Sequence, residues 1–369
     1  MTTAEPTQPE PTNVQGRLTA SIVIPVHNRA TITRQCLDAL LAEPEDEIDR
    51  QLVVIDDGST DMTPSLLDSY GDRILVIRNE TALGFAGACN AGVAAATGEF
   101  VVLLNNDTVP TSGWLSALVT YAVQHPAAAV VGAKLLFPND TIQHAGVVIG
   151  LNSLPHHIYA GFPADHPATC VSRRFQIVTA ACALVRRGPW QELGGLDTAY
   201  LNGWEDVDYC LRAGEAGHEI HYCAECVVYH LESASRSLIS DIERANQELF
   251  IGRWRHRVEP DDYRYYWRDG LITAQYPARY PIQLSVSPLL AGVTVGENHR
   301  LADKLLFERA RQVMILLRNN IVLNVRVQEA EARAIEADRQ LAEFQLKQSR
   351  TVESGSEHDP SSSNEVMKH

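Results

Sequence analysis

Two acidic segments follow directly on apolar runs in the first third of this 369-residue chain. Residues 51–55 (QLVVI) lead into Asp56–Ser59, and residues 100–104 (FVVLL) lead into Asn105–Asp107. Ligands of open α/β sheets bind at the carboxyl ends of the strands, so acids at these positions face a substrate or a metal ion. The pattern therefore predicts a polar binding site along one edge of a sheet.

The two segments differ in the chemistry that they offer. Asp107 supplies a hard oxygen ligand for Mg²⁺ or Mn²⁺, an ion that bridges the oxygens of a diphosphate. Asp56 and Asp57 can accept hydrogen bonds from a base N–H or from ribose hydroxyls. Two local interpretations stay open, a turn with a helix N-cap at the first segment and an Asx turn at the second.

A third acidic segment lies farther along, where three acids fall within four residues at Glu205, Asp206 and Asp208. They stand at the expected start of a helix, where they would also complement the helix dipole. Trp204 offers a stacking wall beside them, and Asp206 is placed to accept a proton from a hydroxyl. His230 ends an apolar run 24 residues after Asp206 and is a candidate metal ligand, although a lone histidine on a strand is more often structural.

Strand-like and helical segments alternate along the chain, which predicts an α/β fold with a layered, mostly parallel sheet. The expected strands are 21–26, 51–55, 74–77, 100–104, 128–132, 175–186 and 218–229, and the expected helices are 31–41, 60–70, 84–96, 114–125 and 205–216. Glycines around Asn90 would allow close approach of a ligand or of backbone, but they do not form a dinucleotide-binding pattern. Residues 138–167, rich in Pro, Gly, His and Asn, predict a mobile excursion over the site.

The composition narrows the classes of partner. Lysine and arginine number 31 against 46 aspartates and glutamates, a net charge of −15 that argues against a nucleic-acid partner. The seven scattered cysteines suggest reduced thiols, including structural thiols at Cys223 and Cys226. With neither a secretory leader nor a bilayer-length apolar run in view, we expect a cytoplasmic protein, and contact with the inner face of the membrane stays open.

The chain divides by composition into five stretches. We expect a disordered leader over 1–18, the main α/β domain over 19–258 and a connecting segment over 259–299. Residues 300–350 are rich in Leu, Ala, Glu and Arg and predict helices, either an oligomerising coiled coil or a helical extension folded back on the domain. The acid- and serine-rich residues 351–369 predict a disordered tail.

Taken as an ordered set, these motifs resemble those of the family 2 glycosyltransferases. The set consists of Ile24–Asn28, Asp56–Asp61, Asn105–Asp107, Trp204–Asp206 and His230, within residues 20–255. The nearest resemblance is to rhamnosyltransferase-like and galactofuranosyltransferase-like members that build bacterial surface polysaccharides. It implies a GT-A fold, a nucleotide-diphosphate sugar donor, a divalent metal (Mn²⁺ or Mg²⁺) and inversion at the anomeric carbon.

The resemblance also implies roles for individual residues. Asp107 and His230 would bind the metal, and Asp206 would be the general base. Donor-nucleotide contacts are expected from Pro25, Val26, His27, Asn28, Asp56, Asp57, Asn90 and Asn106, and acceptor contacts from Trp204, Glu205 and Thr179. Asn105 stands where the family often has Asp, which removes one anion from the metal site. Thr179 and the small residues after it would floor the acceptor pocket or pack tightly in the core.

These residues predict a metal-dependent inverting glycosyltransferase that moves a sugar to a hydroxyl of a glycan or lipid-linked acceptor. A metal under the diphosphate and one base at the acceptor suffice for a single displacement. The alternatives are a non-catalytic sugar-nucleotide-binding scaffold assembled through the C-terminal helices, and a nucleotidyltransferase. His144, His156 and His157 are interpreted as ordinary loop histidines, and the basic residues 253–257 as a solvated helix face or a contact for a lipid-linked diphosphate.

Overall fold

The structure is a computed structural model that describes residues 17–43, 48–150, 152–231, 241–275 and 283–292, with 330, 333–336 and 339. Two compact units are present, residues 1–298 and 299–369, and all the predicted site residues belong to the first. In the second unit the described residues are helical, and Arg339 pairs with Glu336. The rest of the predicted C-terminal helices, the tail and residues 1–16 of the leader lie outside the described residues.

The first half of the main unit is a parallel sheet with helical crossovers. Its strands lie in the order β3-β2-β1-β4 and are β1 (Leu18–Val26), β2 (Ile48–Asp57), β3 (Leu75–Asn79) and β4 (Phe100–Leu104). The connections contain α1 (Ala30–Ala42), α2 (Thr63–Asp68), the 3₁₀ turn η1 (Gly71–Arg73) and α3 (Gly84–Ala95). This half confirms the predicted alternation, and it brings the ends of β2 and β4 to the same edge of the sheet.

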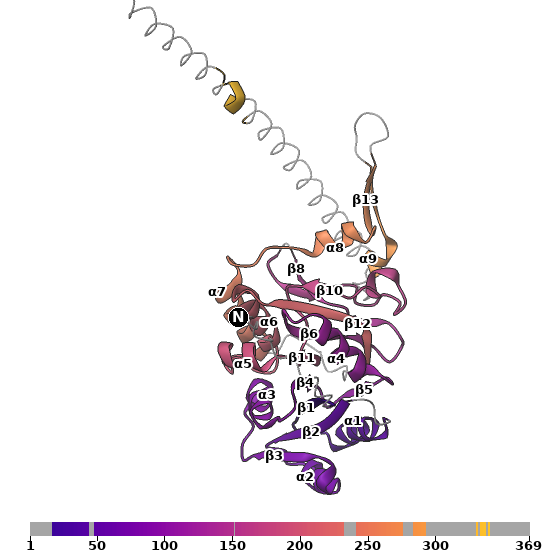
Figure 1. Cartoon of the computed structure of the whole chain (residues 1–369), viewed down its shortest axis with the longest axis vertical. Coiled ribbons are helices and arrows are strands. Elements are labelled where there is room, and N and C mark those ends of the chain that lie inside the picture. Colours follow the sequence, from indigo (N-terminus) through magenta and orange to yellow (C-terminus); the bar gives the residue numbers. More distant parts are fainter. Residues whose placement is uncertain are drawn as a thin grey trace, which may run out of the picture. The chain divides into compact units, whose positions relative to one another are not determined.

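The second half continues the same sheet with mixed strand directions (Figure 1). β11 (Cys182–Val185) lies antiparallel between β4 and β6 (Ala128–Leu136), and β12 (Glu219–His230) runs parallel to β6. Three short strands complete it, β5 (Thr108–Pro110) and β10 (Arg173–Phe175) on β12, and β7 (Ile142–His144) on β6. The sheet is therefore mixed, and the prediction of a mostly parallel sheet is correct only for its first half.

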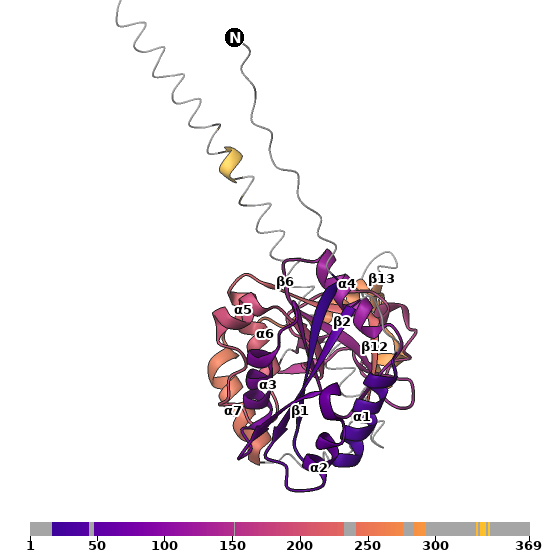
Figure 2. The same cartoon turned by 60° about the horizontal axis from the view of Figure 1, so that its bottom comes forward.

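Helices cover both faces of this sheet (Figure 2). α1, α2 and α4 (Trp114–Gln124) share one apolar core with inward side chains of β1, β2 and β4. On the other face lie α3, α5 (Arg187–Leu193), α6 (Glu205–Glu215) and α7 (Asp241–Trp254). A Cβ on Gly92 of α3 would stand 2.3 Å from Val23 and 2.6 Å from Ile55, so the small residues of this helix allow close packing on the sheet.

Two sequence-based expectations are wrong. Residues 138–167 do not form an irregular excursion, since they contain β7, β8 (Val147–Ile149) and β9 (Pro155–His157) with a largely buried apolar complement. Residues 175–186 are not one strand either. The backbone leaves the ladder between β10 and β11, because the N–H groups of residues 179 and 180 donate to side chains instead of to a neighbouring strand.

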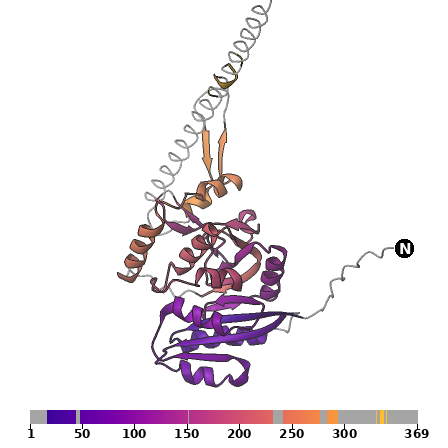
Figure 3. The same cartoon turned by 60° about the vertical axis from the view of Figure 1, so that its left-hand side comes forward.

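The segment after residue 258 belongs to the first unit, and a buried ion pair attaches it to the sheet. It consists of α8 (Asp262–Arg268), a hairpin of β13 (Ile272–Gln275) and β14 (Gln283–Val286), and α9 (Pro288–Gly292). Figure 3 shows the hairpin extending beyond α8. Arg173 of β10 binds Asp269 with N–O distances of 2.9 and 3.0 Å, and both side chains are nearly buried. Among the described residues, no helix combines the length and apolar composition that crossing a bilayer requires.

Candidate active site

Asp107 and His230 meet where the end of β4 lies against the end of β12. β5 begins directly after Asp107 and pairs with β12 so that Thr108 lies opposite His230. The N–H of Leu231 donates to the carbonyl of Asp107 at 2.8 Å. Asp107 Oδ1 consequently lies 3.0 Å from His230 Nε2. The structure thus brings together the two predicted metal ligands, although they are far apart in the sequence.

The carboxyl group of Asp107 is held in its charged form. Its side chain is 16% exposed and that of His230 is 12% exposed. Burial raises the pKa of Asp107, while the hydrogen bond and the positive charge offered by His230 lower it, and the net shift is downward from 3.8. Asp107 therefore presents an anionic oxygen at neutral pH.

Two side-chain amides contact the same imidazole. Gln143 Oε1 lies 2.6 Å from His230 Nδ1, and Asn105 Nδ2 lies 3.3 Å from His230 Nε2. The other end of the Asn105 amide, Oδ1, is buried and accepts no hydrogen bond from any residue that the structure describes. Buried acceptors without a donor call for an ion or a water. Together these atoms form a site that a cation would satisfy.

The residues present fit a hard divalent ion. The 3.0 Å between Asp107 Oδ1 and His230 Nε2 is the spacing of adjacent ligands in an octahedron with bonds of about 2.1 Å. Within the described ranges no group of three or more His, Cys, Asp or Glu side chains gathers as a metal cluster. The pair would therefore be completed by the Asn105 amide, by water or by the substrate's own oxygens.

The first turn of α6 holds an acidic pair with unequal environments. Asp206 Oδ2 accepts from the N–H of Ala180 at 3.0 Å, and its Oδ1 accepts from Val207 at 2.8 Å. Glu205 is 4% exposed and accepts from the N–H of Gly203 at 2.6 Å. Burial, with the neighbouring charge of Asp206, raises the pKa of Glu205 to about 8. At neutral pH Glu205 is therefore protonated, and it places no second negative charge beside Asp206.

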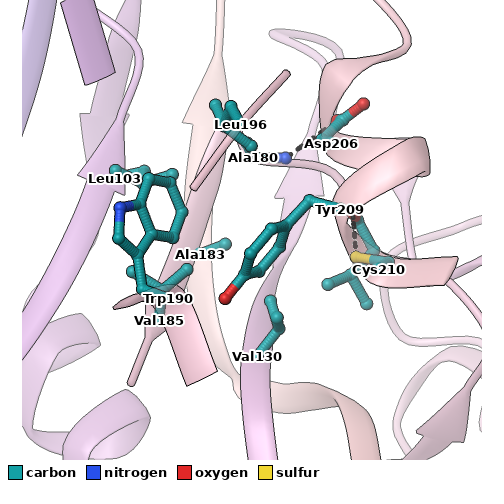
Figure 4. A pocket seen from close by; sticks show the side chains of 11 residues that line it. Leu103, Val130, Ala180, Ala183, Val185, Trp190, Leu196, Asp206, Tyr209 and Cys210 are labelled. Carbon is teal, nitrogen blue, oxygen red and sulfur yellow. Dashed lines mark hydrogen bonds between the residues drawn. The ribbon is translucent and has the colours of Figure 1, made fainter. Parts of the chain in front are cut away.

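Apolar side chains pack next to Asp206 on the side that faces the core. Figure 4 shows Asp206 with its carboxylate turned away from Trp190 and Tyr209 and bonded to Ala180. The small hollow beneath is lined mainly by apolar side chains of β4, β6, β11, α5 and α6. This hollow is part of the core between α6 and the sheet.

Residues 179–181 connect the two halves of the site. The Ala181 carbonyl accepts from the N–H of Asn105 at 2.9 Å, next to the Asp107–His230 pair. The Ala180 N–H donates to Asp206, and the Thr179 N–H donates to His144 Nε2 at 3.3 Å. One short segment therefore bonds to Asn105 after β4, to Asp206 and to a buried histidine. Thr179, predicted to contact the acceptor, belongs to this segment, and that contact stays a prediction.

The loop before α6 has an unusual backbone. Asn202, Gly203 and Trp204 all have positive φ, at 53°, 149° and 77°. Such a conformation costs a non-glycine residue about 1 kcal/mol or more, so neighbouring contacts must hold it. Asn246 of α7, 3% exposed, accepts from Leu201 N–H and donates to the carbonyls of residues 201 and 203 at 2.9–3.0 Å.

A second contact from α7 fixes the aromatic residue of this loop. Trp204 packs on Phe250 with ring centroids 5.0 Å apart, one helical turn after Asn246. Asn202 Oδ1 meanwhile accepts from the N–H of Phe85 at the start of α3. The loop is thereby bound to two helices, which hold Trp204 and Glu205 next to Asp206. A contact of either residue with an acceptor stays a prediction.

At the end of β1, the predicted donor residues form a close network with the turn after β2. Asn28 Oδ1 accepts from the N–H groups of Thr60 and Asp61 at 2.8 and 3.2 Å, and Asn28 N–H donates to Ser59 Oγ. His27 Nδ1 lies 2.7 Å from the carbonyl of Asp57. Pro25 and Val26 are buried in β1 directly before this turn. The residues of the first two motifs thus lie side by side.

The two acids at the end of β2 bond mainly within the protein. Asp57 accepts three hydrogen bonds at 2.8–2.9 Å, from Asn79 Nδ2, Leu83 N–H and Gly84 N–H. Asp56 accepts from Ser59 N–H at 3.1 Å and lies 3.7 Å from Arg78. Asp57 therefore anchors the start of α3. A direct contact of either acid with a nucleotide stays a prediction.

The two predicted asparagines are also engaged. Asn90 binds the backbone of Leu196 through both ends of its amide, at 2.8 and 2.9 Å, and so ties α3 to the loop after α5. Asn106 donates to Thr33 of α1 at 2.8 Å. Their contribution to nucleotide binding likewise stays a prediction. The structure shows each of them positioning an element beside the site.

Several residues that hold the site escaped the sequence interpretation. Gln143 and Asn246 have neutral amide side chains, and they belong to no sequence motif that would indicate a role at the site. His144, interpreted as an ordinary loop histidine, is fully buried in β7, and burial lowers its pKa to about 3. Arg253, interpreted as part of a solvated face, instead pairs with Asp197 and Asp208. The seven cysteines are free thiols, six of them buried.

Comparison with known sequences identifies the domain. A profile described as "Glycosyl transferase family 2" matches residues 21–191. An uncharacterized protein of Sinorhizobium fredii, y4gI, is 33% identical over 235 residues, which are 60% of this chain and 25% of that protein. The O-antigen biosynthesis protein RfbC of Myxococcus xanthus is 31% identical over 284 residues, 73% of this chain and 22% of that protein. The chain thus spans about a quarter of the length of these two relatives.

Comparison with solved structures shows the fold. The crystal structure of GalNAc-T7 with UDP, GalNAc and Mn²⁺ superposes with a TM-score of 0.53 at 18% identity, covering 65% of this chain and 48% of that one. This confirms the predicted GT-A fold.

Proposed function

The chain belongs to glycosyltransferase family 2 through residues 21–191, and on that premise we propose that it transfers a glycosyl group from a nucleotide-diphosphate sugar to an acceptor hydroxyl with inversion. The observation that carries this proposal is the junction at residues 179–181. It binds the end of β4 beside the Asp107–His230 pair, and it also binds Asp206. A site for the leaving diphosphate and a base for the acceptor are thereby held in one rigid frame.

The divalent ion is assigned to the first of these places. Asp107 and His230 would hold it, with Asn105 beside them. The buried oxygen Asn105 Oδ1 has no hydrogen-bond partner among the described residues, and a cation would supply one. Mg²⁺ or Mn²⁺ bound at this place would offset the negative charge that builds on the departing nucleoside diphosphate. It would also neutralise part of the field of a chain with net charge −15.

Asp206 is assigned as the base at the second place. It takes the proton of the acceptor hydroxyl while the oxygen of that hydroxyl bonds to the anomeric carbon and the bond to the diphosphate breaks. Its two hydrogen bonds with backbone N–H groups aim the carboxylate and leave further lone pairs for the hydroxyl. Protonated Glu205 keeps a second negative charge away from Asp206.

The donor nucleotide is assigned to the edge formed by the ends of β1 and β2. His27 and Asn28 border it, and the backbone that Asp56 and Asp57 hold in place forms its wall. Trp204 and Thr179 are assigned to the acceptor. The name of RfbC supports a role in assembling a surface polysaccharide, with a glycan or a lipid-linked glycan as acceptor. A cytoplasmic location, at the inner face of the membrane for a lipid-linked acceptor, and oligomerisation through residues 300–350 complete the proposal.

The proposal is tested by the release of nucleotide. The full chain is incubated with a panel of nucleotide-diphosphate sugars and Mn²⁺, and the free nucleoside diphosphate is measured with and without EDTA. We expect slow, metal-dependent hydrolysis of one donor, and a loss of about 10²–10⁴-fold in transfer for Asp206→Asn with an unchanged melting temperature. Thermal stabilisation by a donor that is never hydrolysed or transferred would instead support the non-catalytic scaffold.

A further inference from the structure

Gln143 occupies a break in the pairing of β7 with β6. His144 lies opposite Leu135 and Ile142 lies opposite Leu136, so two steps along β7 face one step along β6. Gln143 is the extra residue of this bulge. Bulges turn a side chain out of the regular alternation and occur often beside active sites. The bulge explains why the side chain of Gln143, which is 5% exposed, reaches His230 at the end of β12.

The side chain of Gln143 meets one nitrogen of His230. Gln143 Oε1 and His230 Nδ1 are 2.6 Å apart, and the two residues are 87 positions apart in the chain. An amide oxygen only accepts hydrogen bonds, so Nδ1 must carry the proton. The other ring nitrogen, Nε2, is then the one with a lone pair in the neutral ring. Two groups compete at Nε2. Asn105 Nδ2, a donor at 3.3 Å, favours the lone pair there, whereas Asp107 Oδ1, an acceptor at 3.0 Å, favours a proton. The bond between Nδ1 and Gln143 is what opposes the shift of the single proton of a neutral ring to Nε2.

We propose that Gln143 is a positioning residue that fixes the tautomer and the ring orientation of His230, so that the Nε2 lone pair faces the cation site beside Asp107. The inference rests on the proposed function insofar as that site binds a metal. An imidazole ligand must be deprotonated at the nitrogen that binds the metal, and the bond at the other nitrogen decides which one that is. Gln143 performs this for His230 without contacting substrate or metal.

Two variants of nearly equal size separate this role from packing. Gln143→Met keeps the length of the side chain but removes the acceptor, and Gln143→Glu keeps an acceptor oxygen at the same place. His157→Phe is the control, because His157 Nδ1 bonds the backbone carbonyl of Gln143 at 2.8 Å. The control disturbs the same bulge and leaves the bond to His230 in place.

The first measurement needs no metal and no substrate. Long-range ¹H–¹⁵N spectra of the metal-free full chain, labelled with ¹⁵N-histidine, are recorded at about pH 8, where an ordinary imidazole is neutral. The His230 signals are assigned by their loss in His230→Ala. We expect the Nδ1–H tautomer in the unaltered chain, in Gln143→Glu and in His157→Phe, and a mixture or the Nε2–H tautomer in Gln143→Met. An unchanged Nδ1–H tautomer in Gln143→Met would overturn the inference.

The second measurement is Mn²⁺ binding, followed by electron paramagnetic resonance of the free ion. We expect Gln143→Met to weaken the affinity about 10–100-fold, as losing an outer-shell partner does, while Gln143→Glu and His157→Phe stay within about threefold of the unaltered chain. Equal affinity in Gln143→Met would also overturn the inference. If the unaltered chain binds no Mn²⁺, the metal role in the proposed function fails, and the tautomer spectra alone decide for or against the role of Gln143.

Discussion

The ends of β2 and β4 carry similar residues but have opposite hydrogen-bonding states. At the end of β2, Asp57 accepts three hydrogen bonds from protein N–H groups. At the end of β4, among the described residues, the one side-chain group within hydrogen-bond distance of Asp107 is the His230 ring, and Asn105 Oδ1 has no hydrogen-bond partner. β1 alone separates the two strands in the sheet. The difference therefore comes from the segment that succeeds each strand and not from the strand's position.

This difference indicates which acids are structural and which await a ligand. The carboxylate of Asp57 is already satisfied by the start of α3, so it organises the protein. At the end of β4, Asn105 Oδ1 has no donor within the described part of the chain, and a buried acceptor without a partner costs about 1–3 kcal/mol unless a ligand or water supplies one. An acid at a strand end is thus a better candidate for ligand binding when the fold leaves it short of donors.

The largest expected effect is on activity at the end of β4. Asp107→Asn should lower metal-dependent transfer by more than about 100-fold, because it removes the only anionic ligand of the proposed site. Its effect on the free energy of unfolding should stay near 1 kcal/mol or less, since only the contact with His230 is lost. Nucleotide release and urea denaturation of the same samples measure the two quantities. Full activity with a large loss of stability would reverse our assignment of the two strand ends.

The same substitution at the end of β2 should act mainly on stability. Asp57→Asn replaces one acceptor oxygen with a donor that faces backbone N–H groups, and hydrogen bonds to a charged group contribute about 1.5–3 kcal/mol each. We expect a loss of about 3 kcal/mol in the free energy of unfolding, measured by urea at pH 7. Asp107→Asn serves as the matched control. Equal urea midpoints for the two variants would show that the number of hydrogen-bond donors around each carboxylate does not affect its contribution to stability.

The third prediction concerns Glu205, a buried carboxyl group with few hydrogen-bond donors, and the pH dependence of the stability to which it contributes. Its pKa is raised from 4.5 to about 8, so its contribution to stability is fully present below pH 4.5 and is lost as the pH rises through 8. Glu205→Gln, which mimics the protonated acid, should match the unaltered chain near pH 4.5. At about pH 9 it should be more stable by a few kcal/mol, because each tenfold change in proton affinity between the folded and unfolded chain corresponds to ~1.4 kcal/mol. Parallel pH profiles of thermal stability would contradict this expectation.

The smallest expected effect concerns the turn beside the end of β2. Asn28 has a φ of 58° and accepts from Thr60 and Asp61 N–H. Asn28→Ala should cost about 2 kcal/mol, because it loses these bonds and keeps a strained backbone, whereas Asn28→Gly should cost about 1 kcal/mol less. Urea denaturation of the pair measures the difference. A more stable Ala variant would show that the backbone changes conformation and that Asn28 is not needed for it.

Much of the fold was predictable because its first half follows local rules. Apolar runs alternating with helical segments gave the parallel strands β1 to β4 and their helices, and the motifs marked the carboxyl ends of β2 and β4. The prediction failed at residues 175–186. An apolar composition is compatible both with a strand and with a buried segment outside the sheet, so it could not distinguish the two. The bonds of residues 179 and 180 to His144 and Asp206, 35 and 26 positions away, decided between the two.

The residues of the site were predictable by chemical type, and their partners were not. Asp107, Asp206 and His230 stood out as acids and an imidazole at the ends of elements. Gln143 and Asn246 are amides in stretches without periodicity, and their effect lies in one bond to His230 and in three bonds to the loop at residues 201–203. Nothing in a neutral amide's neighbours in sequence shows what it will bond across the molecule.

Residue types and their order were enough to place acids and an imidazole at the ends of buried segments, because apolar periodicity and short-range turn chemistry are local. Folding then settled which of these groups would be left without donors. That outcome depends on contacts between residues far apart in the chain, such as Gln143 with His230 and Asn105 with Ala181, and on the helix start that approaches Asp57. A hydrogen bond depends on distances of a few tenths of an ångström, and only the packed chain sets these.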